Sequence, residues 1–163
     1  MQTRKLTALA LYATLSLAIY AAENMLPPLA PIPGFKLGLA NVITLILLLR
    51  YTSREAALVL IVRILLSALL FGQVISLLYS LAGGILSLLV MYFSNKSLGG
   101  KFPQLTGAMG GLSHNIGQIF MACFITGTSG VLAYLPFLLP VGIITGLFTG
   151  YCALFADKYL PKQ

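Results

Sequence analysis

The sequence predicts an all-α membrane protein, a bundle of six transmembrane helices with both termini in the cytoplasm. Three observations predict this fold: a high apolar content, a scarcity of charge, and the placement of that charge between long apolar runs. Of the 163 residues, 59% are hydrophobic and 8% are charged, and the mean hydropathy is +0.98. A soluble domain contains about 25% charged residues. The charges here are too few to cover a soluble surface, so most of the surface is expected to face lipid.

The apolar runs divide into six candidate spans that use nearly the whole chain. A spanning helix needs about 20 apolar residues, so residues 1–163 are expected to form a single transmembrane domain with no room for a soluble one. The spans are predicted at about residues 6–26, 34–49, 55–71, 74–93, 104–125 and 131–156. The run after Lys5 is longer than the apolar core of a signal peptide, so it is interpreted as the first span.

Proline, glycine and polar residues separate the spans. The breaks fall at residues 27–34, 50–54, 72–73, 94–103 and 126–130. Pro136 and Pro140 lie within the last run and are expected to kink or shorten that helix, because proline removes a backbone donor.

The basic residues predict the orientation. The net charge is +7, from ten Lys and Arg against three Asp and Glu. Eight of these ten fall on one side of the predicted bundle: Arg4, Lys5, Arg50, Arg54, Lys96, Lys101, Lys158 and Lys162. Cytoplasmic loops carry the excess of Lys and Arg, so both termini are predicted to be cytoplasmic. The charge is explained by the lipid bilayer, and no nucleic-acid partner is expected.

Arg63 departs from this pattern because it lies in the middle of an apolar run. A charge at that depth costs several kcal/mol unless it is paired or hydrated. The chain has three acidic residues, Glu23, Glu55 and Asp157, and only Glu23 is placed to approach Arg63 from the other side. Arg63 therefore pairs with Glu23, caps backbone carbonyls, binds an anion or reaches the interface, and the sequence leaves these alternatives open.

The fifth predicted span carries three polar residues near its middle, His114, Asn115 and Gln118. His114 and Gln118 are four residues apart and share a helix face. Such groups need internal partners or a polar cavity. They serve either as hydrogen bonds between helices or as part of a binding site.

Polar residues gather in the outer half of the predicted bundle and form a candidate substrate-binding site. Its residues are Glu23, Lys36, Asn41, Arg63, His114, Asn115 and Gln118, with Asn24 and Gln73 in the same half. Two cations and a histidine against one carboxylate favour an anionic or strongly polar ligand, and apolar walls would suit a ligand with an apolar part. A helix start at Gly34 would add backbone donors close to Lys36.

Small residues form stripes that let helices approach closely. The stripe of the first span is Ala10, Thr14, Ala18 and Ala22, and glycines follow the same spacing at 107 and 111 and at 142, 146 and 150. The stripes serve either packing within the chain or, for the first span, docking to a partner membrane protein. Cys123 and Cys152 have no CxxC partner and are expected to be packing residues.

Several chemistries are excluded by what the sequence does not contain. It has no Walker A motif for ATP hydrolysis, and its single Asp cannot form the Asp-rich cluster that would hold the Mg²⁺ of a diphosphate. A lone histidine is poor support for a metal site. The chain is therefore expected to be no enzyme, with no catalytic residue, no metal and no cofactor.

Three stretches resemble a known bacterial family. Residues 33–41 (PGFKLGLAN), 81–84 (LAGG) and 110–118 (GGLSHNIGQ) are similar to the glycine-rich stretches of heptaprenyl diphosphate synthase component I, also called the Gx transporter family. The likeness covers nearly the whole chain. This family in turn resembles the substrate-binding (S) components of energy-coupling factor transporters. Those have six helices, cytoplasmic termini, an outward-facing site and a first span whose small residues dock onto a coupling protein.

The resemblance implies a membrane substrate-binding component of an energy-coupling factor uptake transporter in the bacterial inner membrane. It would bind a small anionic or amphipathic molecule from outside, an isoprenoid or quinone precursor by the family label. Its partners would be a transmembrane coupling protein and separate ATPase subunits. The alternatives are a non-catalytic membrane subunit of a prenyl diphosphate synthase and a self-contained channel or exchanger.

Overall fold

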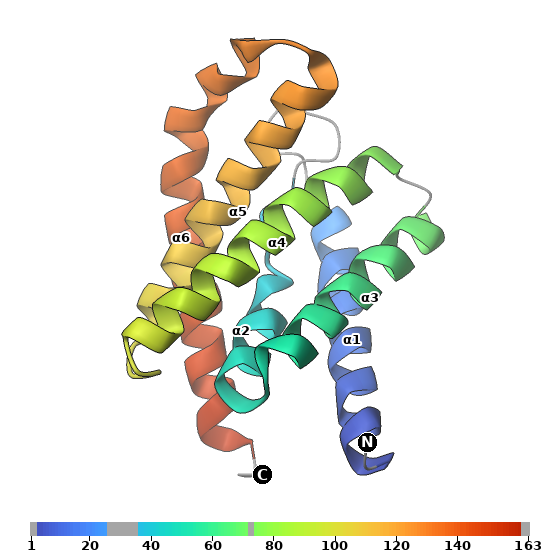
Figure 1. The fold of residues 1–163 in the computed structure, drawn as a ribbon, viewed down its shortest axis with the longest axis vertical. Coiled ribbons are helices and arrows are strands. Elements are labelled where there is room, and N and C mark those ends of the chain that lie inside the picture. Colours follow the sequence, from blue (N-terminus) through green and yellow to red (C-terminus); the bar gives the residue numbers. More distant parts are fainter. Residues whose placement is uncertain (1–2, 26–35, 72–73, 161–163) are drawn as a thin grey trace.

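The computed structural model describes residues 3–25, 36–71 and 74–160, and within these ranges every regular element is a helix (Figure 1). The elements are α1 (Thr3–Asn24), α2 (Asn41–Arg50), α3 (Ser53–Phe71), α4 (Val74–Ser97), α5 (Pro103–Thr126), the 3-10 helix η1 (Ser129–Tyr134) and α6 (Leu135–Tyr159). The all-helical prediction is thus confirmed for the described part of the chain. The proline-rich loop up to Pro33, Gly34 itself and the reversal at residues 72–73 lie outside it.

Among the described residues, three segments are long and apolar enough to cross a membrane: α1, α4 and the continuous run Ser129–Tyr159 of η1 and α6. Large apolar side chains also cover the outside of the bundle. Leu69 is 80% exposed, Val74 71% and Phe124 84%. Extensive apolar exposure marks a surface that contacts something other than water, and together with the apolar helices it indicates a membrane protein.

Helix α2 begins later than predicted. The predicted span 34–49 is wrong at its start, because residues 36–40 are not helical and α2 runs only from Asn41 to Arg50. Gly38 has φ +78°, a left-handed conformation that glycine adopts readily and that a helix cannot include. At 1.5 Å per residue, ten residues cover about 15 Å, roughly half of the bilayer core of about 30 Å.

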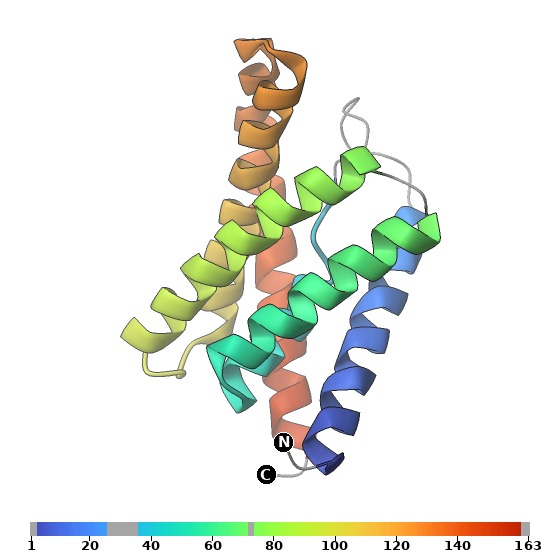
Figure 2. The same cartoon turned by 45° about the vertical axis from the view of Figure 1, so that its right-hand side comes forward.

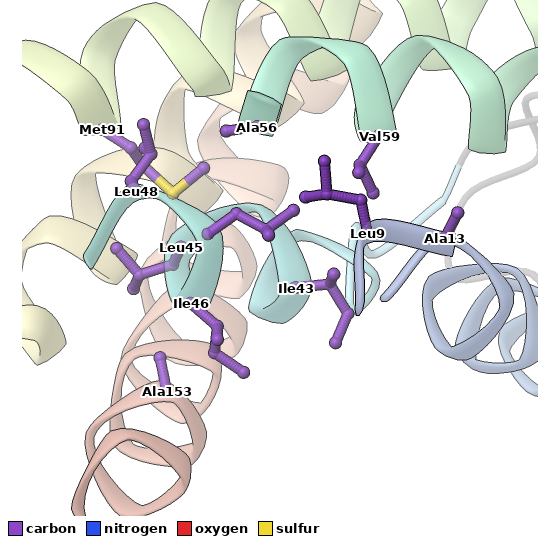
Figure 3. Close-up of a cluster of buried hydrophobic side chains, with 11 residues drawn as sticks. Leu9, Ala13, Ile43, Leu45, Ile46, Leu48, Ala56, Val59, Met91 and Ala153 are labelled. Carbon is purple, nitrogen blue, oxygen red and sulfur yellow. The ribbon is translucent and has the colours of Figure 1, made fainter. Parts of the chain in front are cut away.

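The short α2 lies at the centre of the molecule and contacts all five other α-helices. Figure 3 shows its apolar side chains surrounded by those of α1, α3, α4 and α6. The buried cluster consists of Leu9, Ala13, Ile43, Leu45, Ile46, Leu47, Leu48, Ala56, Val59, Met91 and Ala153. Burying one such large aliphatic side chain contributes about 1.5–3 kcal/mol. This packing fixes the position of α2 and, with it, of the non-helical segment 36–40 that leads into it.

Helices α5 and α6 approach each other through glycine. A Cβ atom on Gly111 would collide with the backbone of Gly142, and one on Gly146 would collide with the backbone of Gly107. The glycine stripes of these two helices therefore serve packing within the chain. Pro136 lies in the first turn of α6, where a missing N–H is tolerated, and Pro140 lies inside α6 without ending it.

The beginning of α1 and the end of α6 lie at the same end of the bundle (Figure 1). Two ion pairs join helices there. Lys5 pairs with Glu55 and links α1 to α3, and Arg50 Nη1 lies 3.0 Å from Asp157 Oδ1 and links α2 to α6. Figure 2 shows α1 running beside α3 from this end, which we call the basic end, toward the opposite one.

Candidate ligand-binding site

Polar side chains from four helices and from residues 36–40 converge in the half of the bundle away from the basic end. We call this set the polar cluster: Tyr20, Glu23, Lys36, Asn41, Arg63, His114 and Gln118. Every member except Lys36 is at most 5% exposed. Buried polar groups normally have hydrogen-bond partners, so the arrangement of partners within the cluster is informative.

Glu23, near the C-terminal end of α1, holds the segment that precedes α2. Its Oε1 accepts a hydrogen bond of 2.8 Å from the backbone N–H of Gly38, and its Oε2 accepts one of 3.1 Å from Leu39. The sequence left Arg63 as a possible partner of Glu23, but among the described residues no ion pair joins Glu23 to Arg63 or to Lys36. The carboxylate still acts on Arg63 through its charge.

Two cations lie over the ring of Tyr20. The Lys36 ammonium is 5.3 Å from the ring centroid and the Arg63 guanidinium carbon is 5.9 Å from it, distances at which a cation is attracted to an aromatic face. The Tyr20 hydroxyl is 2.9 Å from Ser76 Oγ of α4. Lys36 Nζ also donates to the side-chain oxygen of Asn24. Tyr20 therefore draws α1, α3, α4 and residue 36 together.

Arg63 is the buried cation of the polar cluster, and burying a charged group without hydrogen-bond partners costs free energy. Its side chain comes from α3 and is 3% exposed, yet Nε and Nη2 have no hydrogen-bond partner among the described residues. Arginine stays protonated at any ordinary pH, so these donors belong to a buried cation. Of the alternatives left open by the sequence, capping of backbone carbonyls by Nε and Nη2 is not found.

His114 and Gln118 pack against two glycines. A Cβ atom on Gly38 would lie 2.8 Å from His114 Cδ2, and one on Gly83 of α4 would lie 2.9 Å from Gln118 Cγ and 3.0 Å from His114 Cε1. Both side chains thus fit only because these positions have no side chain. Neither ring nitrogen of His114 has a hydrogen bond of normal geometry in the described structure.

The two ends of the Gln118 amide have different surroundings. Its Oε1 accepts a long hydrogen bond of 3.4 Å from the backbone N–H of Lys36. Its Nε2 has no partner among the described residues. With Arg63, Gln118 therefore adds another buried donor to the same cluster.

The two predicted asparagines differ in role. Asn41 Nδ2 lies 3.4 Å from Ser87 Oγ, which itself donates to the Gly110 carbonyl of α5, and Asn41 Oδ1 is unpartnered in the described part of the chain. Asn115 instead donates from Nδ2 to the Leu138 carbonyl of α6 at 2.7 Å. Asn115 therefore forms a hydrogen bond between α5 and α6, which is one of the two roles considered for it from the sequence. Its amide nitrogen does not point into the polar cluster.

The small-residue stripe of α1 lies on the outside of the bundle. All four of its residues are exposed: Ala10, Thr14, Ala18 and Ala22. The buried residues of α1, among them Leu9, Ala13 and Tyr20, are on its other side. The stripe is thus not used for packing among the described residues.

Sequence reasoning missed four residues that shape the site: Tyr20, Gly38, Gly83 and Ser87. Tyr20 could have been found from its spacing, because it lies three residues before Glu23 and so on the same helix face. Gly38 and Gly83 both fall within the glycine-rich stretches compared above. Ser87 offers no signal of its own, since a lone serine in an apolar helix is ordinary.

The cluster is suited to binding a polar or negatively charged group. It combines a buried guanidinium, an ammonium, an imidazole and an amide donor with one carboxylate that is already engaged by backbone donors. Among the described residues, no group of three His, Cys, Asp or Glu side chains is placed to hold a metal ion.

The family described as heptaprenyl diphosphate synthase component I matches residues 12–156, a range that includes the whole polar cluster. No significant match was found among curated proteins or among solved structures.

Proposed function

The chain belongs to the heptaprenyl diphosphate synthase component I family, and we propose that it is the substrate-binding membrane component of an energy-coupling factor uptake transporter. The observation that carries this proposal is the polar cluster, a set of buried donors away from the basic end that no described residue satisfies. Leaving a buried donor unpaired costs about 1–3 kcal/mol, and more for a charged group. A ligand that supplies the acceptors would repay that cost.

The proposed topology is six membrane-embedded helices with both termini in the cytoplasm of a bacterial inner membrane. The gathering of the basic residues at the end where α1 begins and α6 ends supports it, because Lys and Arg favour the cytoplasmic side. In this arrangement α2 is a half-helix. Its leading segment, residues 36–40, enters at membrane depth, where non-helical backbone is tolerated only inside protein or beside a polar cavity.

In this proposal, the ligand is a small anionic or amphipathic molecule that enters from outside. The cationic side chains favour negative charge, and the apolar interior suits an apolar part. An isoprenoid or quinone precursor is suggested by the family name alone. In the proposal the chain itself is not catalytic, because its single aspartate, Asp157, cannot form the Asp-rich cluster that would hold a metal diphosphate.

For energy coupling, α1 would dock onto a transmembrane coupling protein that separate ATPase subunits drive. The exposed stripe of Ala10, Thr14, Ala18 and Ala22 supports this, because small residues let two helices approach closely in lipid.

The family name also favours a second candidate, a non-catalytic membrane subunit of a prenyl diphosphate synthase. Affinity purification of the chain from gently solubilised native membranes separates the two. Co-purification of ATPase and coupling subunits supports the transporter, and a soluble, Asp-rich synthase in their place would overturn it.

A matched pair of variants sharpens this experiment. Ala18→Leu adds bulk to the exposed stripe of α1, and Ala133→Leu makes the same change at an exposed residue of η1. Under the transporter proposal Ala18→Leu reduces recovery of the coupling subunits and Ala133→Leu does not. Equal recovery with both variants would remove the stripe from the docking surface.

A further inference from the structure

We propose that the Nε–Nη2 edge of Arg63 binds an oxyanion, a carboxylate or a phosphate group, through two parallel hydrogen bonds. This inference rests on the proposed function in that it assigns the chemical class of the ligand at the same site.

The two unpartnered donors of Arg63 lie on one edge of its guanidinium. Nε–H and one N–H of Nη2 point in the same direction from the planar group and are spaced like the two oxygens of a carboxylate or phosphate. Both atoms are buried and without a hydrogen bond among the described residues. A single hydroxyl or carbonyl oxygen could satisfy only one of them well, so two adjacent oxygens on one ligand group fit this edge best.

The acids of the chain are already committed elsewhere. Glu23 Oε1 accepts a hydrogen bond from the backbone N–H of Gly38, and Glu23 Oε2 accepts one from the backbone N–H of Leu39. Glu55 and Asp157 pair with Lys5 and Arg50 at the basic end. The charge of Glu23 and the Tyr20 ring offset the burial of Arg63 in part, but they do not occupy its two donors.

The groups around Arg63 are also mainly donors and cations. Gln118 presents an unpartnered Nε2, and Lys36 shares the Tyr20 ring with Arg63. His114 lies within range of the Arg63 charge. An organic cation would be repelled by Arg63 and Lys36, and a neutral ligand would leave the buried charge of Arg63 only partly compensated. An anion satisfies both requirements.

The binding experiment uses the full chain in a maltoside detergent that contains no phosphate. The probes are inorganic phosphate and acetate, with chloride at equal ionic strength as the reference and methylammonium chloride as the cation control. The thermal unfolding midpoint is measured against probe concentration. We expect phosphate, acetate or both to raise the midpoint above the chloride reference, and methylammonium to have no such effect.

Three variants test the role of Arg63. Arg63→Gln removes the charge and the paired donors, and should abolish the shift. Arg63→Lys keeps the charge without the two-donor edge, and should weaken binding about tenfold, or ~1.4 kcal/mol. Arg54→Gln is the matched control, because Arg54 is an exposed arginine in the first turn of the same helix, outside the polar cluster, and it should leave anion binding unchanged.

Two arms distinguish the source of the anion. If native mass spectrometry detects a retained phospholipid that Arg63→Gln loses, the oxyanion is a lipid headgroup. A midpoint shift by the soluble probes assigns it to a free solute. The proposal is overturned if neither is seen in the wild type, or if Arg63→Lys binds as tightly as the wild type.

Should Arg63→Gln fail to fold, Arg63→Lys decides the matter, because it keeps the positive charge. It lacks the two-donor edge and should weaken anion binding, and unchanged binding would overturn the assignment. The outcome is separable from the proposed function. Anion binding without coupling subunits would refute the transporter, whereas coupling subunits without anion binding would refute only this inference.

Discussion

Gly38 cannot easily be replaced, because both its backbone conformation and its contact with His114 disfavour a side chain at this position. Its φ of +78° disfavours any L side chain, and a Cβ there would lie 2.8 Å from His114 Cδ2. Gly38→Ala should therefore lose about 1–2 kcal/mol of stability for the backbone alone, and more for displacing His114. Gly99→Ala is the control, because Gly99 has φ +58° and no atom within 4 Å of its Cβ position. Equal unfolding midpoints for the two variants would contradict the contact with His114.

Glu23 anchors residues 36–40 to α1 through two backbone hydrogen bonds. In Glu23→Gln one acceptor becomes an NH₂ group that faces a backbone N–H. The change should cost about 1–3 kcal/mol and increase hydrogen exchange at residues 38 and 39. Glu55→Gln is the control, since Glu55 bonds Thr52 and Lys5 at the basic end. Exchange at 38 and 39 that is unchanged by Glu23→Gln would show that this anchor is not needed.

The sequence predicted which residues are buried and polar more accurately than it predicted their partners. Arg63, His114 and Gln118 stand out because polar residues inside apolar runs are costly, and that rule needs only the sequence. The partner of Glu23 could not be found this way. Its donors are backbone N–H groups freed by a break in helical structure, and a residue pattern does not display free backbone groups.

Among the secondary-structure elements, the sequence predicted every long helix but not the start of α2. The long apolar runs predicted α1, α3, α4, α5 and α6 to within a few residues. The sequence of residues 34–40 is also apolar enough to be read as helix, but Gly38 is left-handed and does not continue a helix, and Glu23 accepts hydrogen bonds from the backbone N–H groups of residues 38 and 39, so residues 36–40 form a non-helical lead into α2. A tertiary contact from a helix 15 or more residues away decided the local structure there.

The close packing of α5 and α6 leaves no room for side chains at the glycines of their contact. A Cβ at Gly111 or Gly146 would overlap the backbone of the facing helix, so the helices must move apart. Gly111→Ala and Gly146→Ala should each destabilise the protein by about 1–3 kcal/mol, as overpacking does. Unfolding in detergent by added dodecyl sulfate measures this. Gly130→Ala serves as the control, because the nearest atom to its Cβ position is Thr128 Oγ1 at 3.4 Å. A similar loss in all three variants would argue against the close α5–α6 contact.

The whole molecule has two chemically different ends, and the proposed orientation in the membrane rests on that difference. The ion pairs Lys5–Glu55 and Arg50–Asp157 lie at the end where α1 begins and α6 ends. The loop between α5 and α6, which includes Thr128, lies at the other end. The sequence has no charged residue from position 119 to position 156, a range that includes this loop and the helical turns on either side of it. Since basic residues stay on the cytoplasmic side, the polar cluster would be reached from outside only if Thr128 faces outward.

Site-specific labelling tests that orientation directly. Replacing Cys123 and Cys152 by serine gives a background without native thiols, to which either Thr128→Cys or Tyr159→Cys is added. Both positions are exposed. A membrane-impermeant maleimide should label Cys at 128 in intact spheroplasts, and Cys at 159 only after the membrane is broken, because the two residues lie at opposite ends of α6 and its preceding turn. The reverse pattern would turn the bundle over and place the polar cluster on the cytoplasmic side, where it could not capture a ligand from outside.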